Sequence, residues 1–502
     1  MKKIINSIIV VGMLGLLLPA CNLDRYPTNT IVLEQALQTF VDAERHRNGF
    51  YNFIRTSNYG TASTATELMS DLFNAAQEFG NRGGVMHTLS LGVPGAGEVS
   101  AIWGNAFFGI AQVNSFLEHI NNVVPANPEQ QARLADFIAE AYYTRAFLYT
   151  VLAKHFMPPI SDANRHTPNL GLPLLTRFDV NYQPSRATIA QTFNFILTDI
   201  ERAQSHSVVS GTTRADRHRI TRDAVYALKA RVLFMMRDNV GAAHYANYLI
   251  NSGRYPLVSS LGNFRNMWHN DGSTPQGLSE DIFTLYASQT SPGPTMGIFG
   301  LFSSGTNRFN PDFIPTQRVI DLYDTTDWRL SVFFSDTATQ IVRNAGVDRP
   351  GVRVLQKFPG NPGLRPAGAP TNHIHMAKVH RIAEMYLIAA EATQSGMRLN
   401  QLRAARGAAP LILSGDALRD AIRDEWVREM IGEGQRIESL RRWGIGFDGR
   451  PPQDPDAVHG YEDPSFTHRN VGPDELYRFT LPIPAHDINT NPNMRQNPGW
   501  GF

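Results

Sequence analysis

The hydrophobic and polar positions of this chain repeat mainly with the period of α-helices. In many segments an apolar residue recurs at every third or fourth position, which places these residues on one face of a helix. Ala101–Ile120 is one example, with Ile102 and Ile110 on its apolar face. Thr188 and Gln191 match a capping box at the start of another predicted helix. The pattern predicts helices over residues 34–55, 66–73, 101–120, 134–156, 187–203, 223–236, 242–251, 379–392 and 416–430.

The early helices are rich in small residues and follow one another as antiparallel pairs, which is typical of tetratricopeptide-like packing. Their spacing is irregular, so we expect degenerate repeats. Residues 255–375 differ, because Pro, Gly, Asn and Ser abound there and apolar stretches are short. We therefore predict a mostly α fold, in which a tetratricopeptide-like helical scaffold carries a loop-rich, irregular insertion containing a few short strands. The expected strands cover residues 281–286 and 352–358.

The same patterns divide the chain into consecutive parts. Residues 34–254 form the N-terminal helical part, and residues 255–375 form the loop-rich insertion. Residues 376–502 return to helix and complete the same globular unit. The segments before them read as a signal peptide, residues 1–20, and a polar tether, residues 21–33.

The segment Asp416–Trp443 combines an amphipathic helix, a Gly-Glu-Gly bend and a dense group of charges. Two carboxylates about 5 to 9.5 Å apart could serve a glycoside hydrolase as general acid and base. Nearby arginines would lower the pKa of these carboxylates, whereas a general acid needs a raised one. We therefore expect a structural ion network that fixes the bend, with no catalytic residue in it. Its members are Glu425, Arg428, Glu429, Glu433 and Arg436.

The N-terminus predicts export and lipid attachment. Lys2 and Lys3 precede an apolar run that is too short to span a bilayer, and the only cysteine, Cys21, follows Leu-Pro-Ala. This arrangement resembles a bacterial lipobox, in which the cysteine is acylated and becomes the new N-terminus. With Cys21 lipidated, no disulfide can form within the chain, and the protein is expected to be anchored to a membrane.

Charge and motifs exclude several classes of function. The formal net charge is +1 and no basic run occurs, which argues against nucleic acid as the main partner. His373 and His375 stand alone, without the HExxH or Cys/His spacing of a metal site. No G-x-S-x-G elbow is present. We therefore predict no metal, no cofactor and no enzymatic activity.

Candidate ligand contacts lie on or beside the loops, because sugars and peptides both bind against flat aromatic rings. Arginine and asparagine side chains beside these rings can bond to hydroxyls or backbone amides. The simpler alternative for each is a loop residue packed against its own scaffold. Trp268 is ambiguous between these two roles. The candidates are Tyr59, Phe79, Asn81, Arg82, Phe299, Phe302, Asn307, Arg308 and Phe309.

Four segments resemble the SusD/RagB family of outer-membrane nutrient-binding lipoproteins. They are RIAEMYLIAAEA (381–392), LNQLRAARG (399–407), EWVREMIGEGQRIESLRRWG (425–444) and FTLPIPAHDINTNPNMRQNPGW (479–500). The resemblance implies a helical scaffold with tetratricopeptide-like pairs, a ligand site in a loop-rich part and no catalysis. It also implies a TonB-dependent β-barrel transporter of the SusC/RagA type as partner, outside the outer membrane of a Gram-negative bacterium.

Two further segments, FVDAERHRNGFYNFIR (40–55) and FNPDFIPTQRVIDLYDTTDWR (309–329), look closest to the peptide-associated RagB branch. We therefore expect a ligand that is an oligopeptide or an oligosaccharide, with a tilt toward peptides. Two other hypotheses stay open from the sequence. One is a lipid-anchored surface glycoside hydrolase, and the other is a helical-repeat adhesin or scaffold without a small ligand.

Overall fold

A computed structural model of the chain describes most residues from Leu37 onward. The predicted signal peptide, Cys21 and the tether lie outside the described residues. The described ranges are 37–77, 82–92, 97–179, 181–206, 216–269, 280–288, 290, 293, 297–299, 302–303, 308–309, 311–335, 349, 351–364, 374–460 and 470–501.

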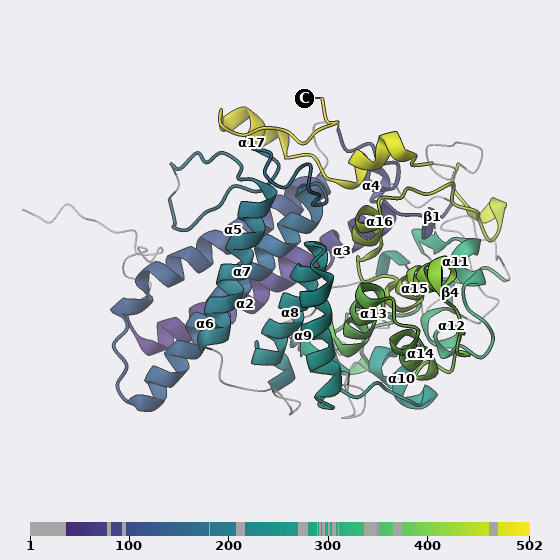
Figure 1. The fold of residues 1–502 in the computed structure, drawn as a ribbon, viewed down its shortest axis with the longest axis horizontal. Coiled ribbons are helices and arrows are strands. Elements are labelled where there is room, and N and C mark those ends of the chain that lie inside the picture. The colour runs from purple at the N-terminus through teal and green to yellow at the C-terminus, as the bar shows by residue number, and fades with distance from the viewer. Residues whose placement is uncertain are drawn as a thin grey trace, which may run out of the picture.

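The first half of the chain forms a stack of helices, at the left and centre of Figure 1. Helix α6 packs against α2, α5 and α7, and α8 packs against α9. Neighbours in the stack are often consecutive in sequence, as expected for degenerate helix pairs. The bounds are α2 Phe40–Asn58, α3 Thr61–Leu68, α4 Gly84–His87, α5 Gly97–His119, α6 Pro128–Phe156, α7 Ile189–His206, α8 Arg222–Met235 and α9 Asn239–Asn251.

Local capping explains where these helices begin. At α6, the Asn127 side chain accepts a hydrogen bond from the Gln130 amide at 2.9 Å, and Pro128 occupies the first turn, where its missing amide costs nothing. The capping box predicted at α7 is confirmed. Gln191 donates its amide to Thr188 Oγ1 at 3.1 Å, and its own side chain accepts from the Thr188 amide at 2.9 Å.

The second half contains shorter helices, most of which occupy the right of Figure 1, while α17 lies at the top, above the helices of the first half. The described strands pair as three antiparallel ribbons, β1–β5, β2–β6 and β3–β4. The prediction of a mostly α fold with a few short strands is confirmed. The bounds are α10 Leu261–His269, α11 Gln317–Asp321, α12 Trp328–Phe333, α13 Ile382–Thr393, α14 Gly396–Ala404, α15 Gly415–Met430, α16 Arg436–Trp443, α17 Ala485–Thr490, β1 Phe73–Ala75, β2 Asp281–Thr284, β3 Phe302–Ser303, β4 Arg308–Phe309, β5 Phe313–Pro315 and β6 Lys378–Arg381.

Two of the predicted elements are wrong in detail. The helix expected over residues 66–73 ends at Leu68, because the Ser70 hydroxyl donates to the Glu67 carbonyl at 2.6 Å and accepts from the Leu72 amide at 3.3 Å. These side-chain bonds turn the chain into β1. The strand expected over residues 352–358 is reduced to one bridge between Leu355 and Phe334. The segment that it faces directly follows α12, where Phe334 has extended backbone and the Ser335 amide donates to the Val354 carbonyl at 3.0 Å.

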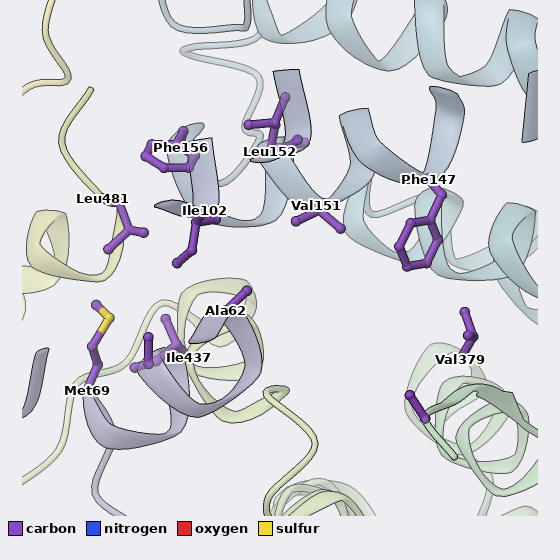
Figure 2. Close-up of a cluster of buried hydrophobic side chains, with 14 of the residues drawn as sticks. Ala62, Met69, Ile102, Phe147, Val151, Leu152, Phe156, Val379, Ile437 and Leu481 are labelled. Carbon is purple, nitrogen blue, oxygen red and sulfur yellow. The ribbon is translucent and has the colours of Figure 1, made fainter. Parts of the chain in front are cut away.

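The largest core cluster joins distant parts of the chain. Figure 2 shows α6 side chains, among them Val151 and Phe156, opposite Ala62 of α3 and Ile437 of α16. The C-terminal tail enters the same core at Leu481, whose amide donates to the His155 carbonyl at 2.8 Å. The two halves therefore share one interior. Among the described helices, none is both long and apolar enough to cross a membrane.

Candidate ligand-binding pocket

The loop residues predicted as ligand contacts occupy different environments in the structure. Phe79, Asn81 and Asn307 lie outside the described residues. Phe302 and Phe309 are cross-strand partners in the β3–β4 ribbon, where Arg308 pairs with Ser303.

Two other predicted contacts are engaged by the protein itself. The ring of Phe299 is 1% exposed and stacks on Phe73 with centroids 4.5 Å apart, so it is a core residue and the prediction of a ligand contact is wrong. Its burial follows from its place beside β5, which pairs with β1. Arg82 is exposed and forms an ion pair with the buried carboxylate of Asp312. A loop position in the sequence therefore did not mean a free side chain.

Tyr59 lines a large pocket between the two halves of the protein. Its hydroxyl donates to the Lys378 carbonyl at 3.3 Å, which ties the end of α2 to β6. The pocket contains about 1000 Å³ of atom-free space, including its opening to solvent.

The walls of the pocket come from nine helices and strands and from the bend after α15. The N-terminal half contributes α2, α3, α6 and α8, with Thr150 and Lys154 from α6 and Arg231 and Phe234 from α8. The C-terminal half contributes α10, β6, α13, α15 and α16. Residues more than 200 positions apart in the sequence therefore face the same space.

Two buried tryptophans give the pocket flat apolar surfaces. Trp426 is 5% exposed and stacks on Phe234, with centroids 6.1 Å apart and planes at 10°. Trp268 is 4% exposed and meets Phe358 edge to face at 5.6 Å. Among the described residues, neither indole N–H has a hydrogen-bond acceptor. Buried indole N–H groups usually find an acceptor, so an oxygen atom of a ligand could accept a hydrogen bond from either of them.

Most charges in the pocket wall are paired within the protein. Arg231 holds Glu384 with two hydrogen bonds of 2.7 Å. Glu433 accepts from Arg381 at 2.6 Å and from Lys357 at 2.6 Å. Two more pocket charges have partners outside the wall, since Lys378 pairs with Asp281 at 3.0 Å and Glu438 pairs with Arg442.

Lys154 is the exception. Its ammonium donates to the Gly434 carbonyl, and no carboxylate of the described residues lies within 4 Å of it. Burial, together with the nearby positive charge of Arg231, lowers the pKa of Lys154 to about 8. At neutral pH the ammonium is therefore mostly charged, and its charge is not matched by a contacting acid.

Behind the bend lies the charge cluster, a group of buried ion pairs centred on Glu429. The carboxylate of Glu429 is 0% exposed and accepts from Arg329 at 3.1 Å, from Arg381 at 2.9 Å and from Arg406 at 2.9 and 3.0 Å. These arginines hold the pKa of Glu429 well below its ordinary value despite the opposing effect of burial. A carboxylate that stays ionised in this way cannot serve as a general acid near neutral pH.

The other members of the expected network also form ion pairs, mostly with residues outside the segment 416–443. Glu425 contacts Arg329 at 2.7 Å, Arg403 at 3.0 Å and Arg428 at 3.1 Å. Arg436 instead pairs with Asp71 at 2.7 Å and so joins α16 to the turn before β1. The sequence located the acids of the cluster, whereas most of the arginines that hold them come from other elements.

The bend itself depends on two glycines with left-handed backbone. Gly432 has φ +78° and Gly434 has φ +72°. A Cβ on Gly432 would lie 2.8 Å from the ring of Phe358, and one on Gly434 would lie 3.0 Å from the backbone of Ser63. Glycine is required at both positions because side chains are excluded by strain and by space.

The acid Glu67 supports the bend by accepting hydrogen bonds from its backbone amides. Its Oε1 accepts from the amides of Gly434 at 2.7 Å and Gln435 at 3.1 Å, while Oε2 has no partner among the described residues. Burial raises the pKa of Glu67 to about 7. No group of three His, Cys, Asp or Glu side chains in the described part of the chain could hold a metal ion.

Sequence reasoning missed most of the pocket residues, including Lys154 and Arg231. A signal was present, because both are charged positions within helices otherwise rich in Ala and aromatic residues. A charge on an apolar helix face indicates either a buried partner or a polar cavity. Arg231 has the partner, and Lys154 faces the cavity.

Comparison with known proteins identifies the family. A model described as "SusD family" matches residues 307–500, and one described as "Starch-binding associating with outer membrane" matches residues 27–234. SusD-like protein P25 of Formosa agariphila is 22% identical over 444 residues, which are 80% of this chain and 78% of that relative.

Solved structures show the same fold. A SusD superfamily protein from Bacteroides thetaiotaomicron aligns with a TM-score of 0.75 at 23% identity, covering 92% of this chain and 100% of that one. A SusD-like carbohydrate binding protein from Bacteroides fragilis aligns with a TM-score of 0.72 at 16% identity, covering 91% and 99%. The two family models together span both halves of the molecule on either side of the pocket, and this chain belongs to the SusD/RagB family.

Proposed function

We propose that this protein is a lipid-anchored binding protein of the outer membrane, which captures oligosaccharides at the cell surface and passes them to a SusC/RagA-type TonB-dependent transporter. It acts by binding alone, without turnover. The proposal extends what similar proteins are described as doing, since the matching models and structures name starch and carbohydrate.

The observation that supports binding most directly is the pocket between the two halves. It combines stacked aromatic rings with polar groups that the protein leaves partly unsatisfied, which is the composition of small-molecule sites. The charge cluster supports the absence of catalysis, because its acids are ionised and fully engaged by arginines.

The test uses the full-length protein extracted from outer membranes in mild detergent. We expect a large β-barrel to co-purify with it, and mass spectrometry under native conditions to detect a retained oligosaccharide. A Cys21→Ser variant should appear in the soluble fraction, because it cannot be acylated. A protein that always purifies alone and gives no saturable heat with any glycan in calorimetry would refute the proposal.

Oligopeptides are a second candidate cargo. The segments at residues 40–55 and 309–329 favour them through their similarity to the RagB branch. The same mass spectrometry separates the two cargoes, because a retained peptide and a retained glycan differ in fragmentation.

A further inference from the structure

The charge balance of the pocket favours a negatively charged ligand. Three cations of the described pocket wall each form an ion pair with an acid of the protein, so they need no acidic group from a ligand. They are Arg231, Lys378 and Arg381. Among the described residues, the Lys154 ammonium donates only to the Gly434 carbonyl, and Glu438, Glu67 and Glu384 act on it from beyond 4 Å. The acids of the wall are all paired with arginine or lysine. A cation would therefore find no free acid there, while an anion would find Lys154.

The remaining unsatisfied groups of the wall are also hydrogen-bond donors. The indole N–H groups of Trp268 and Trp426 are more than nine-tenths buried and lack acceptors among the described residues. Donors of this kind match oxygen atoms on a ligand. The rings that carry them offer flat surfaces, on which the apolar face of a sugar or of a side chain can pack.

We propose that the pocket selects ligands carrying a carboxylate beside a flat apolar face, with Lys154 as the group that recognises the carboxylate. This chemistry is shared by an acidic sugar, such as a uronic acid, and by the C-terminal residue of a peptide. The inference rests on the proposed function. It adds the charge of the ligand and the residue that binds the charged group.

The experiment measures binding of four probes to the full-length protein by titration calorimetry. Two are the acid trigalacturonate and its neutral methyl ester, and two are the tripeptide Gly-Leu-Phe with a free or an amidated C-terminus. We expect one acidic probe to bind tenfold to a hundredfold more tightly than its neutral counterpart, the range of a charge-assisted hydrogen bond. Which acidic probe does so identifies the source of the carboxylate.

Variants assign the selectivity to Lys154. Lys154→Met keeps an unbranched side chain, one atom shorter, and removes its charge, so the ratio of the affinities for the acidic and the neutral probe should fall to about one. Lys229→Met is the matched control, because Lys229 lies on α8, contacts Gln204 and Tyr245, and is not part of the pocket wall. Trp268→Phe keeps an aromatic ring and removes one N–H, and should weaken both members of the preferred pair by a few-fold.

The outcomes are distinct. Equal binding of acidic and neutral probes by the unmodified protein overturns this inference and leaves glycan or peptide capture intact. Saturable heat from none of the four probes overturns the inference as well, whereas the proposed function is judged separately by co-purification and by neutral glycans. A preference that survives in Lys154→Met assigns recognition to another residue and refutes the role of Lys154. The comparison of probes on the unmodified protein needs no variant, so a variant that fails to fold does not decide it.

Discussion

The bend at Gly432–Gly434 lies between two groups of charged residues that differ in how completely they are paired. On one side, the charge cluster gives every ionised group an opposite charge, with Glu429 held by three arginines. On the other side, the described part of the chain offers Lys154 no contacting acid and two pocket indoles no acceptor. The cluster could be recognised in the sequence by its many neighbouring charges. The pocket is recognised in the structure by polar groups that lack a hydrogen-bond or ion-pair partner. Groups that a fold leaves unsatisfied indicate where a ligand belongs better than groups that are merely numerous.

The largest expected effect separates the cluster from any catalytic role. Glu429→Gln leaves Arg329, Arg381 and Arg406 buried around a neutral group, and should lower the free energy of unfolding by about 3–5 kcal/mol. Urea denaturation at pH 7 measures the change. The matched control is Asp416→Asn, an exposed acid paired at the surface with Arg419, which should change it by less than about 0.5 kcal/mol.

A different result would revive the glycoside hydrolase hypothesis. It would require the Glu429→Gln protein to unfold at the same urea concentration as the unmodified protein while losing an activity on glycans that the unmodified protein possesses.

The next effect concerns Glu67, which is partly paired: one carboxylate oxygen accepts two backbone hydrogen bonds and the other has no partner among the described residues. Burial raises its pKa from an ordinary 4.5 to about 7, so the folded protein binds more protons than the unfolded chain between these values. The neutral form of Glu67 therefore makes a contribution to the free energy of unfolding that is complete below pH 4.5. This contribution is lost as the pH rises to 7, by up to about 3 kcal/mol. Glu67→Gln should remove this component. We compare the free energies of unfolding of the variant and the unmodified protein by urea denaturation at pH 4.5 and pH 7.5. The difference, variant minus unmodified protein, should be more positive at pH 7.5. An identical difference at both values would contradict the raised pKa.

The smallest effect has the opposite sign to the first. Lys154→Met should raise the free energy of unfolding at pH 6.5 by about 1 kcal/mol, because the charged lysine is desolvated without a contacting acid. The folded pKa of about 8 is below the ordinary value of 10.5, so the penalty is present below pH 8 and disappears as the pH rises to 10.5. Thermal unfolding at pH 6.5 and pH 10 tests this. A variant less stable than the unmodified protein at pH 6.5 would show that Lys154 is structural, like the lysine of the charge cluster, Lys357.

The sequence predicted well what depends on neighbouring residues. The helix period, the capping box of α7 and the two glycines of the bend are local features, and the structure contains all three. The helix expected over residues 66–73 failed because Ser70 redirects its own backbone, a side-chain effect that the apolar period does not register.

The pocket could not be predicted because its walls are assembled from distant segments. Lys154 meets the Gly434 carbonyl across 280 positions, and Tyr59 meets Lys378 across 319. Single loop residues such as Phe299 were chosen for their type, and only the pairing of β1 with β5 reveals that this ring is interior. Position in a loop is a local property, whereas exposure is decided by the whole fold.

The assembly of the pocket from both halves has a consequence for the loaded protein. A ligand bound between α6 and the bend would contact both halves of the protein. It would stabilise their association, because its site exists only while the two halves are packed together. At a free concentration one hundred times its dissociation constant, such a ligand stabilises the folded state by about 2.7 kcal/mol. Occupied molecules would then open less often than empty ones and resist the proteases of their surroundings longer. Cargo would thereby protect its own carrier until the moment of transfer.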